Sequence, residues 1–320
     1  MGIQKIKGAA YLAGAFALAG TSVVCARIVS GHLGTFTITA ISMVFALLFL
    51  LPVCGRRIAA MVRSMTAGDW LSTGLQALIG IFLFRFFLLN GVARTSAAEA
   101  GILTGATPAI TAILAWALLK ERISVFSAAG VAATVCGVLL IQGLLTPGQK
   151  LSAEHVWGNL LVLCAAASES VFNILSRVFA VKGAARQRQT DPLVQTTLVA
   201  AFALALCLMP ALFEQPVPRL QTLDLSGWLA LAWYGVFVTA LAFICWYAGI
   251  KRCPASMAAA FSGMMPLTAM LLSVTLLGEA AGWTQWLGGT LVMLGMALIG
   301  MKRKARQTRL IAYAEDNLTP

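Results

Sequence analysis

Acidic side chains and histidine are scarce in this sequence, and charges of either sign are few. Asp and Glu number 11, His only 2, and charged residues make up 11% of the chain, whereas 60% of its 320 residues are hydrophobic. The mean hydropathy of +0.88 is far above that of a water-soluble domain, whose surface must be wet. The scarcity of charge therefore argues against a soluble protein and favours one whose solvent is the lipid bilayer.

Motifs for cofactors and metals are also missing. The sequence contains no GxxxxGKS or GxxxxGKT phosphate loop, no HExxH and no cluster of Cys and His residues. Its seven cysteines stand singly in or beside apolar stretches, without a CxxC spacing, and are interpreted as core thiols. No metal or other cofactor is predicted, and ATP-driven transport by this chain alone is not expected.

Apolar stretches of about 20 residues, the length that lets a helix cross the hydrocarbon core, recur along the chain. Arg, Lys, Gly or Pro residues mark the short breaks between them, and the lack of alternation favours helices over a membrane barrel. The sequence thus predicts an all-α polytopic membrane protein of ten spans. They are 8–27, 35–54, 69–91, 95–118, 123–144, 155–179, 191–213, 225–250, 254–277 and 282–301. The first span follows two lysines without a cleavage site, so it is not interpreted as a signal peptide.

The basic residues are distributed asymmetrically among the predicted loops. The net charge of +12 alone would also suit a nucleic-acid partner. With the N-terminus inside, however, eighteen Lys and Arg residues lie in inner loops and ends and four in outer loops, leaving Arg85 within a helix. This positive-inside asymmetry predicts a multi-pass membrane protein with both termini in the cytosol and no nucleic-acid partner.

An internal repeat appears when the chain is shifted by 158 positions. Residues 91–122 then align without a gap on 249–280, and a weaker register at an offset of 150 pairs the first span with the sixth. Because five spans separate the copies, the second copy must cross the membrane in the opposite sense. The prediction is two inverted five-helix repeats, an arrangement typical of carriers. The predicted parts are a cytosolic N-terminus (1–7), a first repeat (8–145), an external linker (146–154), a second repeat (155–301) and a cytosolic tail (302–320).

The sequence resembles the drug/metabolite transporter superfamily, in particular its EamA-like branch of bacterial metabolite exporters. The resemblance rests on the two similar halves, on Leu-Leu-Lys-Glu-Arg at 118–122, on Leu-Leu-Gly-Glu at 276–279, on a proline in each of those spans, and on the segment 20–27. It implies a ten-helix inner-membrane exporter with cytosolic termini.

The fourth and ninth spans carry matched small and polar residues. The positions are Thr104, Gly105 and Pro108 in one half and Ser262, Gly263 and Pro266 in the other. Each proline cannot donate to the carbonyl four residues earlier, which predicts a kink near the middle of the membrane and a carbonyl free for a polar contact. The prolines are candidate hinges for a rocking motion. The glycines serve either close helix packing or the same hinge.

Three charged side chains lie within predicted spans, where charge is costly and needs a partner or a purpose. Arg85 and Glu99 both fall in the outer third. They form a structural ion pair, or act as an outer gate, or leave Arg85 to bind a substrate carboxylate. Glu169 lies near the bilayer centre and shares a helix face with Asn173. It is a candidate for proton coupling or for binding a substrate amine, or else a protonated carboxyl bonded to a neighbouring helix.

Aromatic side chains are concentrated in the third and eighth spans, which the 158-residue shift superposes. Trp246 and Tyr247 are candidate substrate contacts in the eighth span, with core packing or an interfacial belt as the alternative interpretation.

The sequence therefore predicts an alternating-access secondary transporter, not an enzyme, that exports a small metabolite such as an amino acid or related amine from the cytosol. A broad, proton-coupled exporter of cationic drugs is the alternative within transport. An intramembrane enzyme using Glu169 and His155 is the alternative of another class, though no paired acid and nucleophile supports it. The expected partners are the substrate, the lipid bilayer and protons, with the chain a monomer or a homodimer.

Overall fold

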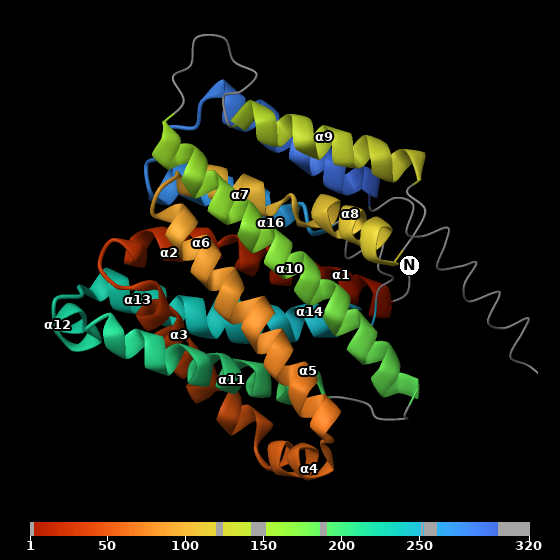
Figure 1. Cartoon of the computed structure of the whole chain (residues 1–320), viewed down its shortest axis with the longest axis vertical. Coiled ribbons are helices and arrows are strands. Elements are labelled where there is room, and N and C mark those ends of the chain that lie inside the picture. Colours follow the sequence, from red (N-terminus) through yellow and green to blue (C-terminus); the bar gives the residue numbers. More distant parts are fainter. Residues whose placement is uncertain are drawn as a thin grey trace, which may run out of the picture.

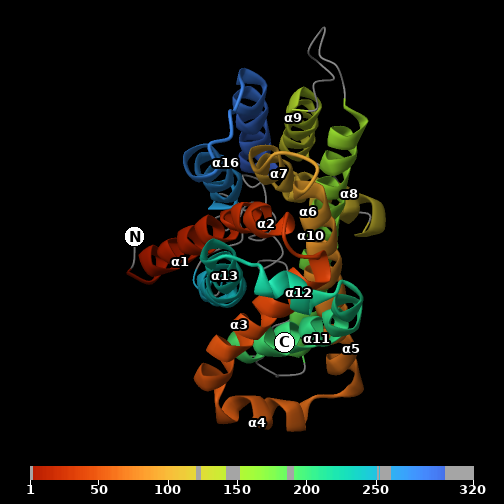
Figure 2. The same ribbon diagram turned by 90° about the vertical axis from the view of Figure 1, so that its left-hand side faces the viewer.

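In the computed structural model the chain folds into a bundle of helices (Figures 1 and 2). The structure describes residues 3–119, 124–141, 152–185, 191–250, 252 and 261–299. The first half contains α1 (Ile3–Gly20), α2 (Ser22–Ser30), α3 (Thr35–Cys54), α4 (Arg56–Ser64), α5 (Ala67–Ala77), the π-helical η1 (Leu78–Leu83), α6 (Phe84–Val92), α7 (Ala97–Thr104), α8 (Thr107–Leu119) and α9 (Val125–Ile141). The second contains α10 (Ala153–Ala185), α11 (Pro192–Phe213), α12 (Pro216–Gln221), α13 (Leu225–Trp233), the π-helical η2 (Tyr234–Leu241), α14 (Ala242–Ile250), α16 (Met264–Leu276) and a last helix, Trp283–Ile299.

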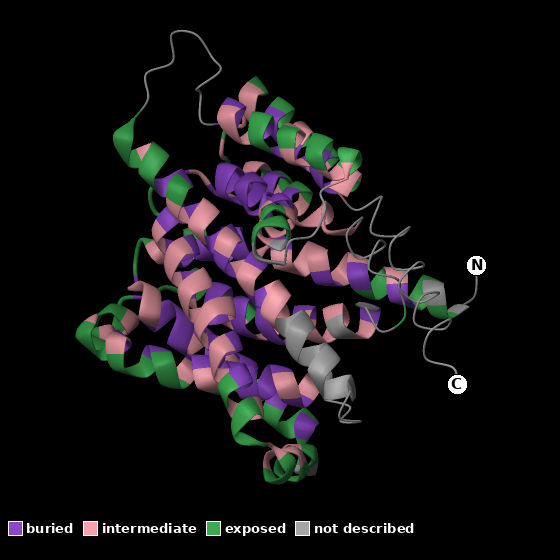
Figure 3. Cartoon of the chain, turned by 45° about the vertical axis from the view of Figure 1, so that its right-hand side comes forward, coloured by how far each residue is buried: buried purple, intermediate pink, exposed green. Residues whose placement is uncertain are grey.

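Seven stretches of the described residues are long and apolar enough to cross a membrane. They are Ile6–Ser30, Thr35–Cys54, Ala67–Val92, Ala97–Leu114, Ala153–Leu175, Leu193–Phe213 and Leu225–Trp246. Three shorter apolar helices are Val125–Ile141, Met264–Leu276 and Trp283–Ile299. Many large apolar side chains on the outside of the bundle are exposed, as lipid-facing residues must be, while buried residues fill its middle (Figure 3). The prediction of an all-helical membrane protein is confirmed; the count of ten spans stays a prediction.

The first span differs from its prediction at both ends. Helix α1 begins at Ile3 rather than at residue 8, because the polar residues before the apolar stretch continue the same helix. It is interrupted at Thr21, whose hydroxyl donates to the carbonyl of Leu18 (2.7 Å), and α2 then continues to Ser30. A side chain at Gly20 would overlap the carbonyl of Met265, so α16 crosses here at close range.

Helices that are far apart in the sequence pack together in pairs. Helix α1 packs along α14, and α6 packs along α10; exchanging the two halves of the predicted repeat would turn the first pair into the second. Helix α3 packs along α11, and α7 packs along α16. Prolines inside α3 and α11, Pro52 and Pro210, are again 158 residues apart.

Helix α9 and the last helix also cross each other, and they lie side by side in Figures 1 and 2. A side chain at Gly130 would overlap the backbone at Gly295, and one at Gly137 would overlap Gly288, where Gly130 and Gly288, like Gly137 and Gly295, are 158 residues apart. Small residues thus bring the two helices into backbone contact.

The third and eighth spans share an irregularity at matched places. Segment η1 separates α5 from α6, and a shift of 158 residues lays it on 236–241, within η2. Short π-helical segments widen a helix by one residue per turn and are frequent at functional sites. The two segments lie deep in the bundle, next to the charged side chains described below.

Candidate functional site

Arg85, in the first turn of α6 after η1, is buried in the middle of the bundle with 5% of its surface exposed. Its Nη1 donates to the hydroxyl of Ser42 on α3, and its Nη2 donates to the hydroxyl of Thr239 on η2. The guanidinium also lies over the ring of Tyr234, with Cζ 3.9 Å from the ring centroid. Neutral groups from two neighbouring elements, α3 and η2, therefore hold the cation.

The predicted alternative in which Arg85 and Glu99 form an ion pair is wrong. Glu99 is only 5% exposed, and its carboxylate faces α10 and the last helix instead. Its side-chain partners are Thr95 Oγ1 (3.1 Å), His155 Nε2 (2.7 Å), Asn159 Nδ2 (3.0 Å) and Gln285 Nε2 (2.9 Å). This orientation follows from the helix start, since Glu99 is the third residue of α7, whose N-cap is Ser96. Glu99 thus joins α7, α10 and the last helix.

The fourth span is broken rather than kinked. Helix α7 ends at Thr104, a tight turn follows, and α8 begins at Thr107, so Pro108 is the second residue of a new helix. Proline is well tolerated there because the first turn of a helix needs no donor. The predicted free carbonyl of Thr104 does accept a hydrogen bond, from the hydroxyl of Thr107 (2.8 Å). Gly105 caps the end of α7.

Glu169, half-buried on α10, lies beside this break. Its Oε2 accepts a hydrogen bond from the hydroxyl of Thr107 (3.0 Å), and the hydroxyl of the adjacent Ser170 donates to the carbonyl of Thr107 (3.0 Å). A carboxyl bonded to a neighbouring helix was one of the predicted alternatives, and it is present here. Asn173, one turn further along α10, is half-buried on the same helix.

The second half has a turn at the corresponding place. Ser262 and Gly263 form a turn, Gly263 is the N-cap of α16, and Pro266 is the third residue of that helix. The turn after α7 and the turn before α16 agree within one residue under the 158-residue shift. Discontinuous helices expose backbone polar groups inside a membrane protein, and in carriers they are found at substrate and ion sites.

Two of the aromatic side chains meet beside a small cavity. Phe172 on α10 contacts Phe243 on α14 edge to face, with ring centroids 6.5 Å apart. These rings, Thr239 and three further side chains (Ile81, Thr196 and Val199) line a small cavity of about 10 Å³, the space of one water molecule. Trp246 is half-buried, and the side chain of Tyr247 lies outside the described part of the chain.

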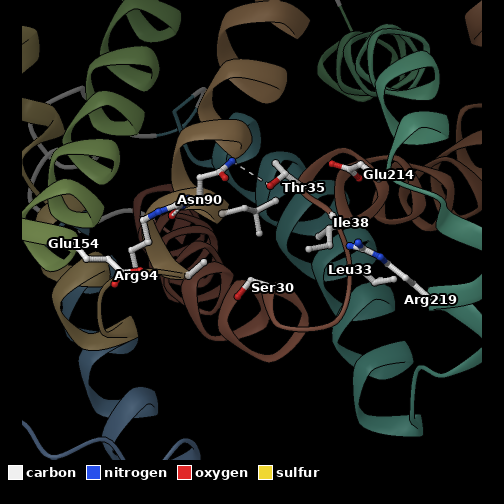
Figure 4. Close-up of a pocket in the computed structure, with 12 residues that line it drawn as sticks. Ser30, Leu33, Thr35, Ile38, Asn90, Arg94, Glu154, Glu214 and Arg219 are labelled. Carbon is white, nitrogen blue, oxygen red and sulfur yellow. Dashed lines mark hydrogen bonds between the residues drawn. The ribbon is translucent and has the colours of Figure 1, made fainter.

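A larger cavity of about 470 Å³ opens at the end of the bundle formed by residues 31–34, 93–96 and 214–224, which we call the hairpin face (Figure 4). Charged side chains line it, namely Arg94, Glu154, Glu214 and Arg219. Ile38 and Leu89, each 1% exposed, line its deep end. Ser42 is four residues beyond Ile38 along α3, and Arg85 four residues before Leu89 along α6. Residues 42 and 85 therefore lie about one helical turn, roughly 5.4 Å, below this apolar layer along their helices.

Two carboxylates cap helix starts at the hairpin face. Glu279, after the end of α16, accepts hydrogen bonds from the backbone N–H groups of Ala97 (3.0 Å) and Ala98 (2.9 Å), and lies 3.9 Å from Nε of Arg27. Glu214 holds the first turn of α3 in the same way. Each carboxylate favours the positive end of the helix it caps, and each joins a helix of one half to a helix of the other.

Several site residues escaped sequence reasoning. Ser42, Thr239 and Tyr234 around the arginine, and Thr107 at the helix break, were not singled out. A polar residue within an apolar span is the signal that would have marked them. Within the described residues, no three His, Cys, Asp or Glu side chains gather as metal ligands.

Comparisons with known proteins agree with this architecture. The sequence profile of the EamA-like transporter family matches residues 6–143 and 156–301. The uncharacterized transporter YetK of Bacillus subtilis (strain 168) is 30% identical over 94% of this chain and 89% of YetK. The WAT1-related protein At3g02690, chloroplastic, of Arabidopsis thaliana is 23% identical over 88% of this chain and 66% of its own length. One crystal structure, 23% identical, superposes with a TM-score of 0.61 over 94% of this chain and 98% of that chain, which shows a common fold. This chain belongs to the EamA-like transporter family.

Proposed function

We propose that this transporter works by alternating access and exports a small metabolite, such as an amino acid or a related amine, from the cytosol. The observation that carries the proposal is a pair of charged side chains within the bundle: Arg85, buried next to η1, and Glu169, half-buried beside the break between α7 and α8. Such charges are expensive within a membrane and mark substrate or ion pathways. A cation and a carboxyl in one apolar interior suit a zwitterion.

The symmetry of the bundle supports the mechanism. Matched π-helical segments, matched helix breaks and interconverting helix pairs are what two inverted five-helix halves would produce. In that arrangement one half rocks against the other about a fixed site and exposes it to the two sides in turn. The proposal includes ten spans with the hairpin face outside and both termini in the cytosol of a bacterium, and the distribution of Lys and Arg supports this orientation.

Two other functions are weighed against this proposal. The rings of Phe172 and Phe243 near Glu169 would suit a proton-coupled exporter of lipophilic cations. An intramembrane enzyme would need Glu169 and His155 to act together. Instead, Glu169 is bonded to Thr107 and His155 to Glu99, in separate networks.

Counterflow in proteoliposomes tests the proposal. Vesicles with the purified protein, loaded with a pool of unlabelled L-amino acids, should accumulate labelled amino acids, and a pH gradient should change the rate if protons are coupled. Exchange of a labelled lipophilic cation without exchange of any amino acid would favour the drug exporter. No flux of either kind, together with turnover of a lipid, would refute transport as the function.

A further inference from the structure

We infer that Arg85, Ser42, Thr239 and Tyr234 form a subsite for the carboxylate of the transported molecule. The inference rests on the proposed function and narrows it, because it makes an anionic group a requirement for binding. The subsite lies between α3, α6 and η2, one helical turn below the cavity of the hairpin face.

The charge of Arg85 is not compensated by any carboxylate that the structure describes. The described ion pairs join Arg27 to Glu279, Arg57 to Asp191 and His155 to Glu99. A guanidinium carries five N–H donors, of which the described contacts of Arg85 use two, both to hydroxyl oxygens. Hydroxyls orient the cation but do not neutralise it, and planar bidentate pairing with a carboxylate is what its remaining donors fit best.

Tyr234 provides a second and independent observation. Its side chain is 1% exposed, and its hydroxyl makes no hydrogen bond in the part of the chain that the structure describes. A buried polar group without a partner costs free energy, so such groups call for an explanation. The ring lies directly against the guanidinium of Arg85. An anion bound there would supply an acceptor for the phenol and a counter-charge for the arginine together.

The surroundings make the subsite selective. Buried apolar side chains such as Val23, Leu88, Leu231 and Val238 pack in the same cluster as Tyr234. A carboxylate entering this region gives up water and is repaid only by the charged and hydroxyl donors, so a ligand lacking the carboxylate leaves them unpaired. Cations without an acidic group, including amines and lipophilic drugs, should therefore bind poorly.

The test compares two pools of ligands on the purified full-length protein in lipid nanodiscs. One pool contains the L-amino acids other than aspartate and glutamate, and the other contains the same amino acids as their carboxamides, which keep the amine and side chain but lack the carboxylate. Ligand binding to the folded state raises the melting temperature. We expect the acid pool to raise it and the amide pool to leave it unchanged.

Two substitutions place the effect at the subsite. Arg85→Met should abolish the response to the acid pool. Tyr234→Phe removes only the unpartnered hydroxyl, so the ligand-free protein should melt no lower than wild type, while half of the response should require an acid concentration about 10- to 100-fold higher. The control is Arg63→Met, an exposed arginine of α4 that lines neither cavity, which should respond like wild type.

The outcomes separate the subsite from the function. An equal response to both pools, no response to either, or a wild-type response from Arg85→Met and Tyr234→Phe would overturn the subsite. If Arg85→Met fails to fold, Tyr234→Phe decides alone. Counterflow that persists unchanged in Arg85→Met would leave transport standing and the subsite refuted, whereas wild-type vesicles that exchange neither pool would refute the function.

Discussion

The buried carboxylate of Glu99 allows a specific prediction about stability. Three donors converge on its Oε2, from Thr95, His155 and Asn159, while Gln285 donates to Oε1. Glu99→Ala removes this shared acceptor from all four donors, of which Thr95 and Asn159 are buried. Because breaking a buried charged cluster from one side typically costs about 3–5 kcal/mol, we expect the free energy of unfolding to fall by that amount.

Glu99→Gln should be much milder. The amide oxygen can take the place of Oε2 and keep three of the four hydrogen bonds, and Gln285 can rotate its own amide to accept from the new NH₂ group. The expected loss is about 1–2 kcal/mol. Unfolding by SDS in bicelles measures both values, with Glu154→Ala, an exposed acidic residue of the same region, as a control expected within about 0.5 kcal/mol of wild type. Equal effects of Glu99→Ala and Glu99→Gln, or an Ala effect no larger than the control, would refute this account of the network.

Three further predictions concern transport and packing. Glu169→Gln should abolish the effect of a pH gradient on counterflow while the protein remains folded; an unchanged pH response would remove Glu169 from proton coupling. Leu89→Ala thins the apolar layer above the arginine, so a Ser42→Cys thiol in an otherwise cysteine-free protein should react several-fold faster with a membrane-impermeant reagent, and equal rates would show that this layer is not the barrier. Gly101→Ala should destabilise the protein by about 1–3 kcal/mol, because its methyl group would overlap Ala269 on α16, and unchanged unfolding in SDS would contradict that close packing.

The helical architecture was predictable because lipid restricts the choice of structure. Long apolar stretches must form helices in lipid. The positions of Pro108 and Pro266 marked the two turns, one before α8 and one before α16. The contact between the freed carbonyl of Thr104 and a hydroxyl was likewise predictable, since both groups lie within one turn of the chain. Glu169 was identified from its depth alone, because a carboxylate in the middle of a span is rare.

The partners that Arg85 and Glu99 contact on other helices could not be predicted from the sequence. Arg85 and Glu99 are close in sequence and at similar depth, which suggested a pair, yet their side chains point to different helices. The direction of each depends on how α3, α10 and η2 pack around them, and packing partners cannot be read from one span at a time. The interruption of the fourth span also differed from prediction, because a proline allows either a kink or a new helix start and only the neighbouring turn decides.

The polar residues of the site differ from the residues at the positions that correspond to them under the 158-residue shift. Under the 158-residue shift Arg85 corresponds to Phe243, and Thr239 corresponds to Ile81. Ile81, Thr239 and Phe243 all line the same small cavity. The corresponding positions 81 and 239 therefore meet there, one with an apolar side chain and the other with a hydroxyl. A fully symmetric pair would place two arginines close together in an apolar interior, where neither could be compensated by the other. With Phe243 in place of a second arginine, the carboxylate subsite that we propose has a single cation, Arg85, and would bind a substrate carrying a single carboxylate in one orientation.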